Sequence, residues 1–394
     1  MVFTQGCHEV EETLTRKKAE TPAVPKWAGS PFLEWESPKF HNDIILRGIF
    51  PAGVYGYEGK TTAMGQLNPD KGILLTYADG RLIWRRALIP HFVNPISPFS
   101  SRIVTFQTSK KVEAMLTWVR GDLFRVQEMA SGSDLWNRPA CLYPTRAGKY
   151  IAGYCFNKVH LMDPDSGHPV KKIATTLPVT NLWSMGKGLL IQHGKGSLSY
   201  MELPGGRVHE PLERPEFKHI AVKKDRVFVL YREERRFVLE MLKYKKPDLY
   251  GGGLVSAWKI FLSLFPATFW VRIQEDQVIH PTGLDCMMSR TMQSGMELWT
   301  SCGLYLFNPP AYDDFGMYML SSRRVGELRP IVFIDGDNGL QTNLFTSHDG
   351  GNETTVDGKF IAPGKVRNGL IYAIHKHSKV VAVRVSAPDT KEND

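Results

Sequence analysis

Residues 74–84 read Leu-Leu-Thr-Tyr-Ala-Asp-Gly-Arg-Leu-Ile-Trp, which is an apolar stretch, a tight polar turn and a second apolar stretch. Similar units occur at residues 116–126, 159–167 and 198–208. Their turn glycines are Gly80, Gly121, Gly167 and Gly206, which lie 41, 46 and 39 residues apart. Two strands joined by a turn and repeated near every forty residues predict a ring of small antiparallel sheets, the β-propeller.

The rest of the chain is consistent with this all-β fold. Short strand-like runs alternate with turn clusters from about residue 46 onward, and no amphipathic helical pattern recurs between them. The 35 Gly and 25 Pro are spread along the chain, as many short strands require. Dividing about 340 residues by a blade of ~40–45 residues predicts seven blades of four-stranded antiparallel sheets, with six or eight as the alternatives.

The pattern divides the chain into three regions. We expect residues 1–45 to form an extended or mobile segment, anchored by Trp27 and Trp35, because a charged stretch is followed by several prolines. Residues 46–386 form a single propeller, and the polar residues 387–394 form a disordered tail.

Two features of the propeller region are the closure of the ring and an insertion within it. The ring should close by pairing residues 380–385 with a strand near residues 44–50. An insertion at 247–272 begins with three glycines and is rich in aromatic residues. It is either a short helix or loop packed onto the propeller, or a protruding apolar element that docks a partner or a membrane surface. It is too short and too interrupted to span a bilayer.

The unit from Tyr77 to Trp84 resembles the repeats of quinoprotein-type and WD-repeat propellers, in which an Asp-Gly turn joins two strands and a Trp packs between blades. Residues 165–173 resemble the same repeats in their Asp-x-Gly turn followed by a strand. The resemblance implies the architecture and no particular chemistry. The terminal Trp-Asp pair of WD repeats and the adjacent cysteine pair of many quinoprotein enzymes are missing, so no bound quinone is expected.

Composition and termini indicate a protein that is not secreted. The first residues lack a basic start followed by an apolar run, and they lack an Arg-rich transit pattern. The five cysteines are odd in number, widely spaced and without a C-x-x-C pair, so we expect neither a disulfide framework nor a zinc site. Reduced thiols are the simplest interpretation, and they predict a cytoplasmic or nuclear location. The net charge of +9 favours anionic partners.

Three further motifs are interpreted as structural. Residues 347–354 resemble a degenerate Asp-box, which is a hairpin turn of sialidase-like propellers. The oxygen-rich run at 335–339 is a tight turn rather than a calcium loop, because the downstream bidentate Glu is missing. His375, His377 and His348 are polar surface residues without a third-ligand pattern. We therefore expect no metal and no cofactor.

The strongest local charge feature is a predicted hairpin, residues 226–231 and 237–242, with a charged turn at Glu233-Glu234. Its basic ends should form a positive rim on one propeller face. Because Arg and aromatic side chains dominate interface energies, the candidate partner-binding residues come from this hairpin and from the insertion. They are Arg232, Arg235, Arg236, Lys245, Lys246, Trp258, Phe265 and Trp270.

The leading interpretation is a non-enzymatic scaffold that mediates protein–protein interaction within a complex, with acidic proteins as the favoured partners. One alternative is a small-molecule enzyme, such as an isomerase, cyclase or hydrolase, with its active site in the central opening. Such a site gathers residues from several blades, so the sequence identifies no catalytic residue. The second alternative is an adaptor associated with nucleic acid through the basic hairpin.

Overall fold

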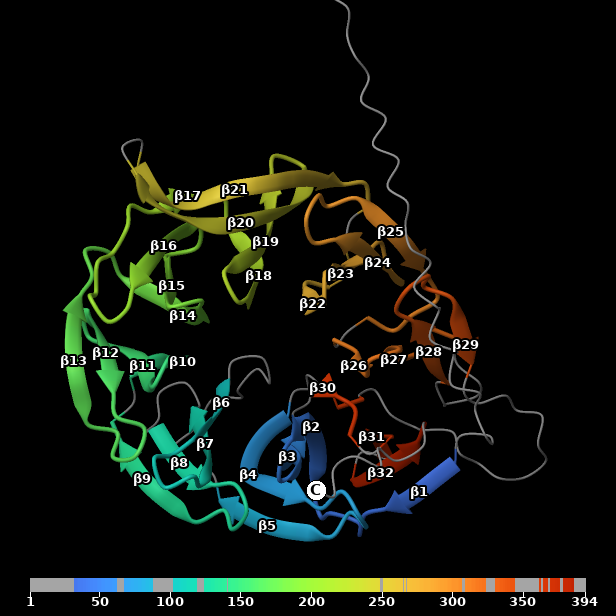
Figure 1. The fold of residues 1–394 in the computed structure, drawn as a ribbon. Helices are drawn as coiled ribbons and strands as arrows, with labels where there is room; N and C mark the ends of the chain where they lie inside the picture. The colour runs from blue at the N-terminus through green and yellow to red at the C-terminus, as the bar shows by residue number, and fades with distance from the viewer. Residues whose placement is uncertain are drawn as a thin grey trace, which may run out of the picture.

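The computed structural model is a closed ring of antiparallel sheets arranged around a central opening (Figure 1). The structure describes residues 32–61, 67–87, 102–118, 124–139, 141–248, 251–264, 266, 268–306, 309–323, 330–343, 361–362, 364–367, 369–375 and 378–385. Within these residues the backbone is all strand, turn and irregular structure, and no helix is long and apolar enough to cross a membrane. The all-β propeller expectation is confirmed.

The first four blades each contain four consecutive strands, ordered from the central opening outward (Figure 1). They are β2 (Asp43–Phe50), β3 (Gly53–Thr61), β4 (Leu67–Leu75) and β5 (Leu82–Ala87); β6 (Arg102–Gln107), β7 (Glu113–Trp118), β8 (Phe124–Glu128) and β9 (Asp134–Arg138); β10 (Leu142–Ala147), β11 (Tyr150–Cys155), β12 (Lys158–Met162) and β13 (Pro169–Ala174); and β14 (Val179–Met185), β15 (Gly188–His193), β16 (Ser197–Glu202) and β17 (Leu212–Glu213).

The next three blades continue this order, and the last of them gains a short parallel strand on its inner side. They are β18 (Phe217–Lys223), β19 (Arg226–Glu233), β20 (Arg236–Asp248) and β21 (Gly251–Leu262); β22 (Arg272–Gln274), β23 (Gln277–Thr282), β24 (Cys286–Thr291) and β25 (Glu297–Ser301); and β26 (Ala311–Tyr312), β27 (Gly316–Leu320), β28 (Ile331–Asp335) and β29 (Gln341–Asn343), with β30 (Gly364–Lys365) beside β26.

The eighth blade joins the two ends of the described chain. It contains β31 (Leu370–His375), β32 (Lys379–Arg384) and, on the outside, β1 (Phe32–Glu36), which pairs antiparallel with β32. The expected pairing of 380–385 with residues 44–50 is wrong, because Asp43–Phe50 is the innermost strand of the first blade. Trp35 of β1 is buried against this closing blade, so burial of its ring favours the observed pairing.

The structure has eight blades rather than the expected seven. The estimate of seven blades leaves out two strands. β1 lies within the expected N-terminal segment, and β21 lies within the expected insertion. In addition, the unit at residues 116–126 includes parts of β7 and β8, the second and third strands of its blade. The turns at Gly80 and Gly167 instead join the third and fourth strands of their blades. An average spacing therefore mixed two different turns of the blade.

The 247–272 segment is neither a helix nor a protruding loop over Gly251–Leu262, where it forms the outer strand of the fifth blade. β20 and β21 form a long antiparallel hairpin, with Phe237 opposite Leu262 and Lys245 opposite Gly253. An outer strand buries the side chains that point inward and exposes the others. Its aromatic residues are therefore only partly covered, which made the segment look like an element added to the propeller. Leu254 and Leu262 are buried in neighbouring clusters, whereas Phe261 is exposed.

Neighbouring blades are joined by a repeated contact between an outer-strand tryptophan and the last turn of the next blade. In each contact the indole N–H donates a hydrogen bond of 2.8–3.0 Å to a backbone carbonyl of the next blade. The donor and acceptor pairs are Trp35 and Tyr77, Trp84 and Met129, Trp136 and Pro164, Trp258 and Met292, and Trp299 and Gly336. The rings lie against Gly80, Gly132, Gly167, Gly295 and Gly339, respectively. Each of these glycines has a positive φ, which favours glycine there.

This contact confirms the resemblance to quinoprotein-type propeller repeats at the level of the fold. The same contact shows that the repeated turn continues beyond the four units identified in the sequence, because Gly295 and Gly339 occupy equivalent turns. The run at 335–339 is confirmed as a tight turn, in which the Asp335 carboxylate accepts the backbone N–H groups of Asp337 and Asn338.

The cysteines differ from the expectation of reduced thiols. Cys141 is bonded to Cys155, and Cys286 to Cys302. Each pair lies at the end of two adjacent antiparallel strands or directly beside it, because Leu142 pairs with Tyr154 and Met287 pairs with Ser301. Sheet pairing brings together cysteines that are far apart in the sequence. The two disulfides therefore correct the expectation of reduced thiols at these four positions.

Several sequence-based expectations fall outside the described residues or side chains. They concern the N-terminal residues including Trp27, the Asp-box region at 347–354, the side chains of His348, His375 and His377, Gly121, Phe265, and the tail at 387–394.

Candidate partner-binding face

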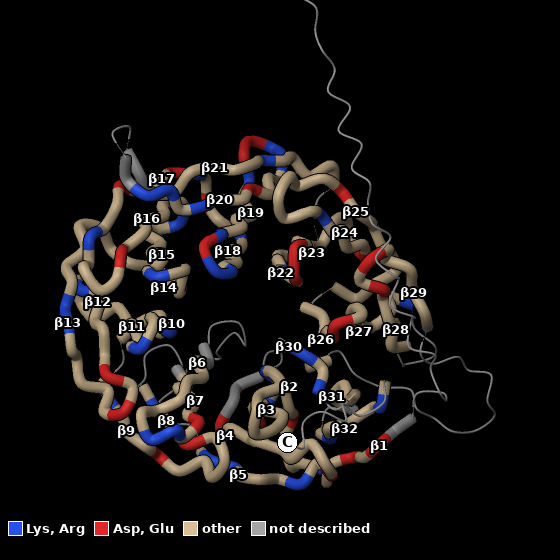
Figure 2. Tube along the Cα trace, in the orientation of Figure 1, with Lys and Arg blue, Asp and Glu red and all other residues tan. Residues whose placement is uncertain are grey.

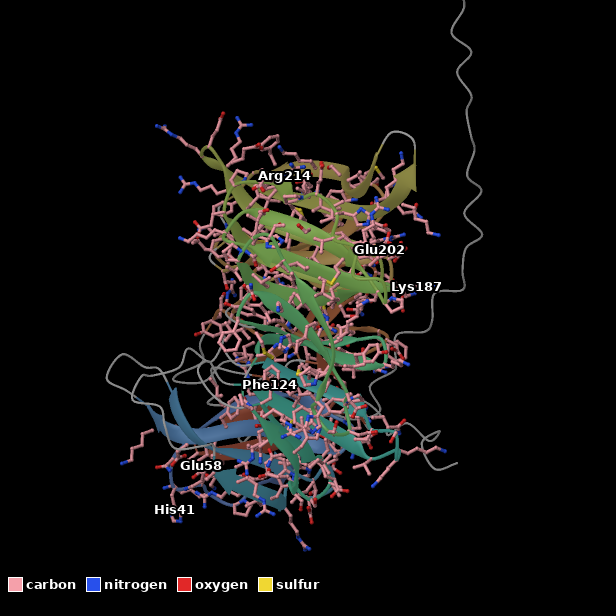
Figure 3. All side chains as sticks on the ribbon, turned by 90° about the vertical axis from the view of Figure 1, so that its left-hand side faces the viewer. His41, Glu58, Phe124, Lys187, Glu202 and Arg214 are labelled. Carbon is pink, nitrogen blue, oxygen red and sulfur yellow. A yellow bond between two sulfur atoms is a disulfide. The ribbon has the colours of Figure 1, made fainter. Side chains whose placement is uncertain are left out.

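The candidate site lies on one of the two flat faces of the ring, which we call the linker face. In a four-stranded blade, the connection to the next blade and the turn between the second and third strands lie at the same end of the strands. In the fifth blade these are residues 214–216, which enter it, residues 234–235 between β19 and β20, and residues 263–271, which leave it. Figure 3 shows the ring edge-on, with Arg214 toward one face and Lys187 of the β14–β15 turn toward the other.

An open cavity of about 520 Å³ lies on the linker face of the fifth blade. Its lining residues come from the segment before β18, from β18, from the β19–β20 hairpin and from the segment after β21. They are Glu216, Lys218, Arg232, Glu234, Phe237 and Phe269. This volume falls within the range of small-molecule pockets and also accommodates a side chain or two of a docked peptide.

The apolar part of the cavity consists of two phenylalanines. The rings of Phe237 and Phe269 lie 5.3 Å apart at an interplanar angle of 31°. Phe237 is buried and packs with Leu262 and Val271, so its position is fixed by the core of the blade. Phe269 is partly exposed. The pair therefore forms a rigid apolar floor that remains accessible to a ligand.

The charged residues of the lining differ in how far they are already paired. Glu216 accepts a hydrogen bond from Lys218 at 2.9 Å and lies 3.7 Å from Lys195, and the hydrogen bond from Lys218 lowers the pKa of the Glu216 carboxyl. Arg232 lines the cavity, and Arg235 lies outside the lining in the adjoining β19–β20 turn. Both are exposed, and neither has an ion-pair partner among the residues that the structure describes. These two guanidinium groups can therefore pair with an external carboxylate.

An exposed aromatic residue extends the basic edge of the cavity. The Arg236 guanidinium carbon lies 5.8 Å from the ring centroid of Phe261, and Lys259 Nζ lies 5.4 Å from the same centroid. Lys259 also pairs with Glu233 at 2.6 Å. Half of the Phe261 side chain is exposed, so the basic groups surround an accessible apolar surface.

Two leucines continue the apolar surface toward the sixth blade. Leu284, in the turn between β23 and β24, is 81% exposed, and Leu264 is 54% exposed. A side chain built on Gly283 would lie 3.4 Å from Leu264, so the turn that carries Leu284 lies beside Leu264. Exposed apolar residues that adjoin a cavity are typical of binding surfaces.

The structure brings only some of the sequence-predicted site residues together. The predicted hairpin is confirmed, because Glu233 pairs with Arg236 and Arg226 pairs with Lys243. Arg232, Arg235 and Arg236 therefore lie at its linker-face end. Lys245 and Lys246 lie toward the other end of β20, so the expected single positive rim is wrong. The eight-residue strand β19 separates the two ends by roughly 23 Å.

The predicted aromatic residues have a different role. Trp258 donates its indole N–H to the Met292 carbonyl and packs on Gly295, as an inter-blade contact. Trp270 is 3% exposed and donates to the Leu306 carbonyl. Neither ring is free to serve as a projecting anchor. Sequence reasoning missed Phe237 and Glu216, because their role depends on the neighbouring segments that the fold brings beside them.

A polar cluster on the opposite face was also missed. His209 Nε2 lies 3.1 Å from Glu202 Oε1 and 3.2 Å from the Tyr244 hydroxyl, which donates to the same carboxylate oxygen. Burial and the Glu202 carboxylate raise the pKa of Tyr244 to about 12, and the bond from Tyr244 lowers that of Glu202. The cluster links the fourth and fifth blades, where β17 provides no docking tryptophan. Its groups satisfy one another, which supports a structural role.

Charged side chains are spread around the described part of the ring and are not gathered in one basic surface. Figure 2 shows Lys and Arg spread around the described part of the ring among Asp and Glu. A nucleic-acid groove would need a continuous basic surface that follows the phosphate backbone. The described part of the ring shows a mixture of both charges instead (Figure 2).

The comparisons with known proteins agree with the fold. No family model and no curated protein sequence matches the chain. The computationally designed Ika8 protein has a TM-score of 0.57 at 11% identity, over 91% of this chain and 100% of that one. BamB from Moraxella catarrhalis has a TM-score of 0.51 at 12% identity, over 90% of this chain and 99% of that one. These likenesses support the β-propeller fold and say nothing about its chemistry. The sheet topology of this chain gives the number of blades, which is eight.

Proposed function

We propose that this protein is a non-enzymatic scaffold whose linker face, at the fifth blade, binds an extended segment of a protein partner. The observation that carries the proposal is that Arg232 lines the same cavity as the Phe237–Phe269 floor and has no ion-pair partner in the described chain. Arg235, in the adjoining β19–β20 turn, is a second exposed guanidinium group without an ion-pair partner among the described residues. A rigid ring presents this surface with little ordering cost, because the core of the blade already fixes its base.

The chemistry of the surface defines the partner segment. A large apolar side chain would occupy the space above Phe269, and acidic side chains beside it would pair with Arg232 and Arg235. Arg–carboxylate pairs can be bidentate, which fixes the direction of the bound segment. Glu216 is already engaged by Lys218 and Lys195, so it does not compete for the two arginines.

The experiment identifies the bound segment and then measures its affinity. A photo-crosslinking phenylalanine analogue placed at position 269 should label a partner in extracts, and sequencing of the crosslink should identify the segment. A synthetic peptide of that segment is then titrated against the unmodified protein and against R232E/R235E. We expect about tenfold or greater weakening in this variant, because two attractive contacts become repulsive.

The matched control changes the same charge at the other end of β20. K243E/K246E alters two exposed lysines on the opposite face and should keep peptide affinity within about twofold. Equal weakening by both double variants would indicate only long-range charge attraction and would contradict the proposed site. A crosslink to nucleic acid, with affinity that falls steeply with salt, would instead support an adaptor role.

A further inference from the structure

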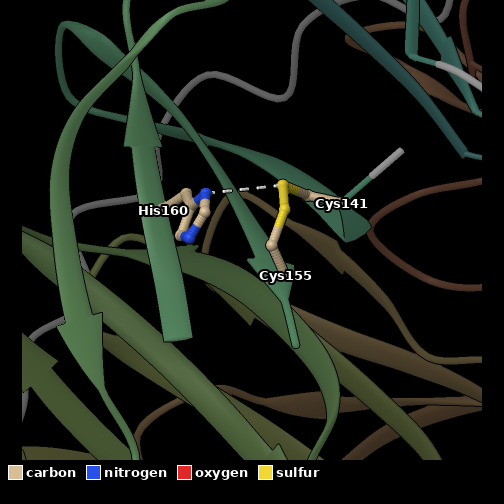
Figure 4. Close-up of side chains that lie close together, drawn as sticks. All are labelled: Cys141, Cys155 and His160. Carbon is tan, nitrogen blue, oxygen red and sulfur yellow. Dashed lines mark hydrogen bonds between the residues drawn. A yellow bond between two sulfur atoms is a disulfide. The ribbon is translucent and has the colours of Figure 1, made fainter. Parts of the chain in front are cut away.

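A second cluster lies on the linker face of the third blade, away from the proposed peptide site. Cys141 lies in the connection between β9 and β10, Cys155 is the last residue of β11, and His160 lies within β12 (Figure 4). The Cys141 sulfur is 3.9 Å from His160 Nδ1. The ligand atoms of all three residues lie within 4.8 Å of one another. Two sulfurs and one imidazole nitrogen are ligand types that zinc prefers.

The backbone beneath the cluster leaves room for it. Gly153 of β11 pairs with His160 of β12. A Cβ atom on Gly153 would lie 2.7 Å from the Cβ of Cys141, which is closer than side chains approach one another. The absence of a side chain at this position therefore allows Cys141 to lie beside the imidazole.

Two lysines lie on the strands that carry the cluster. Lys158 of β12 pairs with Cys155, and Lys172 of β13 pairs with His160. A neutral imidazole offers one ring-nitrogen lone pair to a metal. Two thiolates and one Zn²⁺ sum to zero charge, so the lysines do not face a net positive site.

We propose that the Cys141–Cys155 disulfide is the oxidised form of a zinc site, and that after reduction Cys141, Cys155 and His160 bind one Zn²⁺. A thiol reductant transfers two electrons and two protons to the S–S bond and becomes a disulfide itself. The two resulting thiols lose their protons when Zn²⁺ binds. Three protein ligands leave the fourth tetrahedral position for water.

The distances require little movement beyond separation of the sulfurs. Zn–S and Zn–N bonds of about 2.3 and 2.0 Å at a tetrahedral angle place sulfur and nitrogen roughly 3.5 Å apart. The observed separation between Cys141 and His160 is 3.9 Å. Both the disulfide and the metal would hold the connection between the second and third blades against β11.

The second disulfide provides an internal comparison. The Cys286 sulfur lies 3.6 Å from the Asp285 carboxylate, and in the described part of the chain no His, Cys, Asp or Glu cluster of three includes this pair. The two pairs enclose similar sequence separations, 14 and 16 residues. They differ mainly in the nearby histidine, so reduction should create a metal site in only one of them.

The test uses Co²⁺ as a spectroscopic substitute for Zn²⁺. The full chain is reduced with a phosphine, freed of metal and titrated anaerobically with Co²⁺. We expect one equivalent to give near-ultraviolet cobalt–thiolate absorption that Zn²⁺ abolishes. C286S/C302S should keep this absorption, and C141S/C155S should lose it. H160A should weaken Co²⁺ binding about tenfold or more, because one of three ligands is removed.

Each result decides the proposal. The unreduced protein should bind no Co²⁺ through sulfur, and addition of an oxidant to the zinc form should release the metal. If reduced protein gives no cobalt–thiolate absorption, or if H160A binds as tightly as the unmodified chain, the proposal is wrong. If H160A loses its native circular dichroism spectrum, His160→Gln provides the same comparison with a polar side chain of similar size.

Discussion

The indole N–H of Trp84, on the outer strand of the first blade, donates a hydrogen bond of 2.9 Å to the Met129 carbonyl of the second blade. The same ring covers Gly132, where a Cβ atom would lie 2.7 Å from it. This relationship recurs around the ring, so blade-to-blade stability depends on a repeated aromatic contact. The contribution of each contact to the free energy of unfolding can be measured by substitution at single positions.

Trp84→Ala should destabilise the protein by about 3–5 kcal/mol, because it removes a buried ring and its hydrogen bond. Leu82→Ala, an exposed residue on the same strand, should change stability by less than about 0.5 kcal/mol. Urea unfolding followed by tryptophan fluorescence and circular dichroism measures both. Similar losses at the two positions would contradict a specific role for the inter-blade contact.

Gly167→Ala and Gly148→Ala separate backbone strain from packing. Both glycines have positive φ, 69° and 61°, so each substitution should cost about 1 kcal/mol in backbone strain. A Cβ at Gly167 would lie 2.6 Å from the Trp136 ring, whereas a Cβ at Gly148 meets no atom within 4 Å. We expect Gly167→Ala to lower stability by a further 1–3 kcal/mol or so. Equal thermal denaturation midpoints in the two variants would exclude the packing term.

His280 should make the protein less stable in mild acid. Burial lowers the pKa of His280 to about 4, and the Arg290 guanidinium, which donates to its Nε2 at 3.2 Å, adds to this effect. The unfolded chain binds this proton near pH 6.5, so the unfolded state gains protons first as the pH falls. The stability contribution is fully present above pH 6.5 and is lost between pH 6.5 and 4.

The measurement for His280 is the pH dependence of unfolding by urea. His280→Gln should flatten the stability profile between pH 6.5 and 4, even if it lowers stability overall at pH 7. His41→Gln, at an exposed position, should leave the slope unchanged. His219 is half-buried, and desolvation also lowers its pKa to about 4, so some slope should remain in the His280 variant. An unchanged slope in His280→Gln would show that this residue does not set the acid response.

The two disulfides should be detectable by counting thiols. Denatured, unreduced protein should expose one reactive thiol, Cys7, because the other four cysteines are paired. C141S/C155S and C286S/C302S should each lower stability by about 3 kcal/mol, since the closed loops have similar lengths. Five reactive thiols in freshly oxidised protein would contradict both bonds.

Local chemistry made much of the architecture predictable. The Asp-Gly turn before Trp84 and the tight turn at Asp335 indicate strands and hairpins from adjacent residues alone, and both are observed. The hairpin around Glu233 was also predicted closely, because two short apolar runs flank a charged turn. The number of blades was not predictable in this way, since it depends on which turns occupy equivalent positions in each blade.

The candidate site depended much more on the fold. Arg232 could be selected from its charge, but Phe237 joins it only because three segments of the fifth blade meet beside Phe269. Trp270 was selected for its residue type, yet the fold buries it and uses its N–H for the Leu306 carbonyl. Sequence periodicity reports which way a side chain points within one strand and not what the neighbouring blade places against it.

The amino-acid sequence encodes the turns, the alternation of the strands and the all-β class, because these depend on conformational preferences over a few residues. Closure by β1, the eighth blade and the meeting of Cys141, Cys155 and His160 arise only from tertiary structure. They join residues that are distant in the chain. Their energies come from burial and pairing between strands, which exist only after the ring has formed.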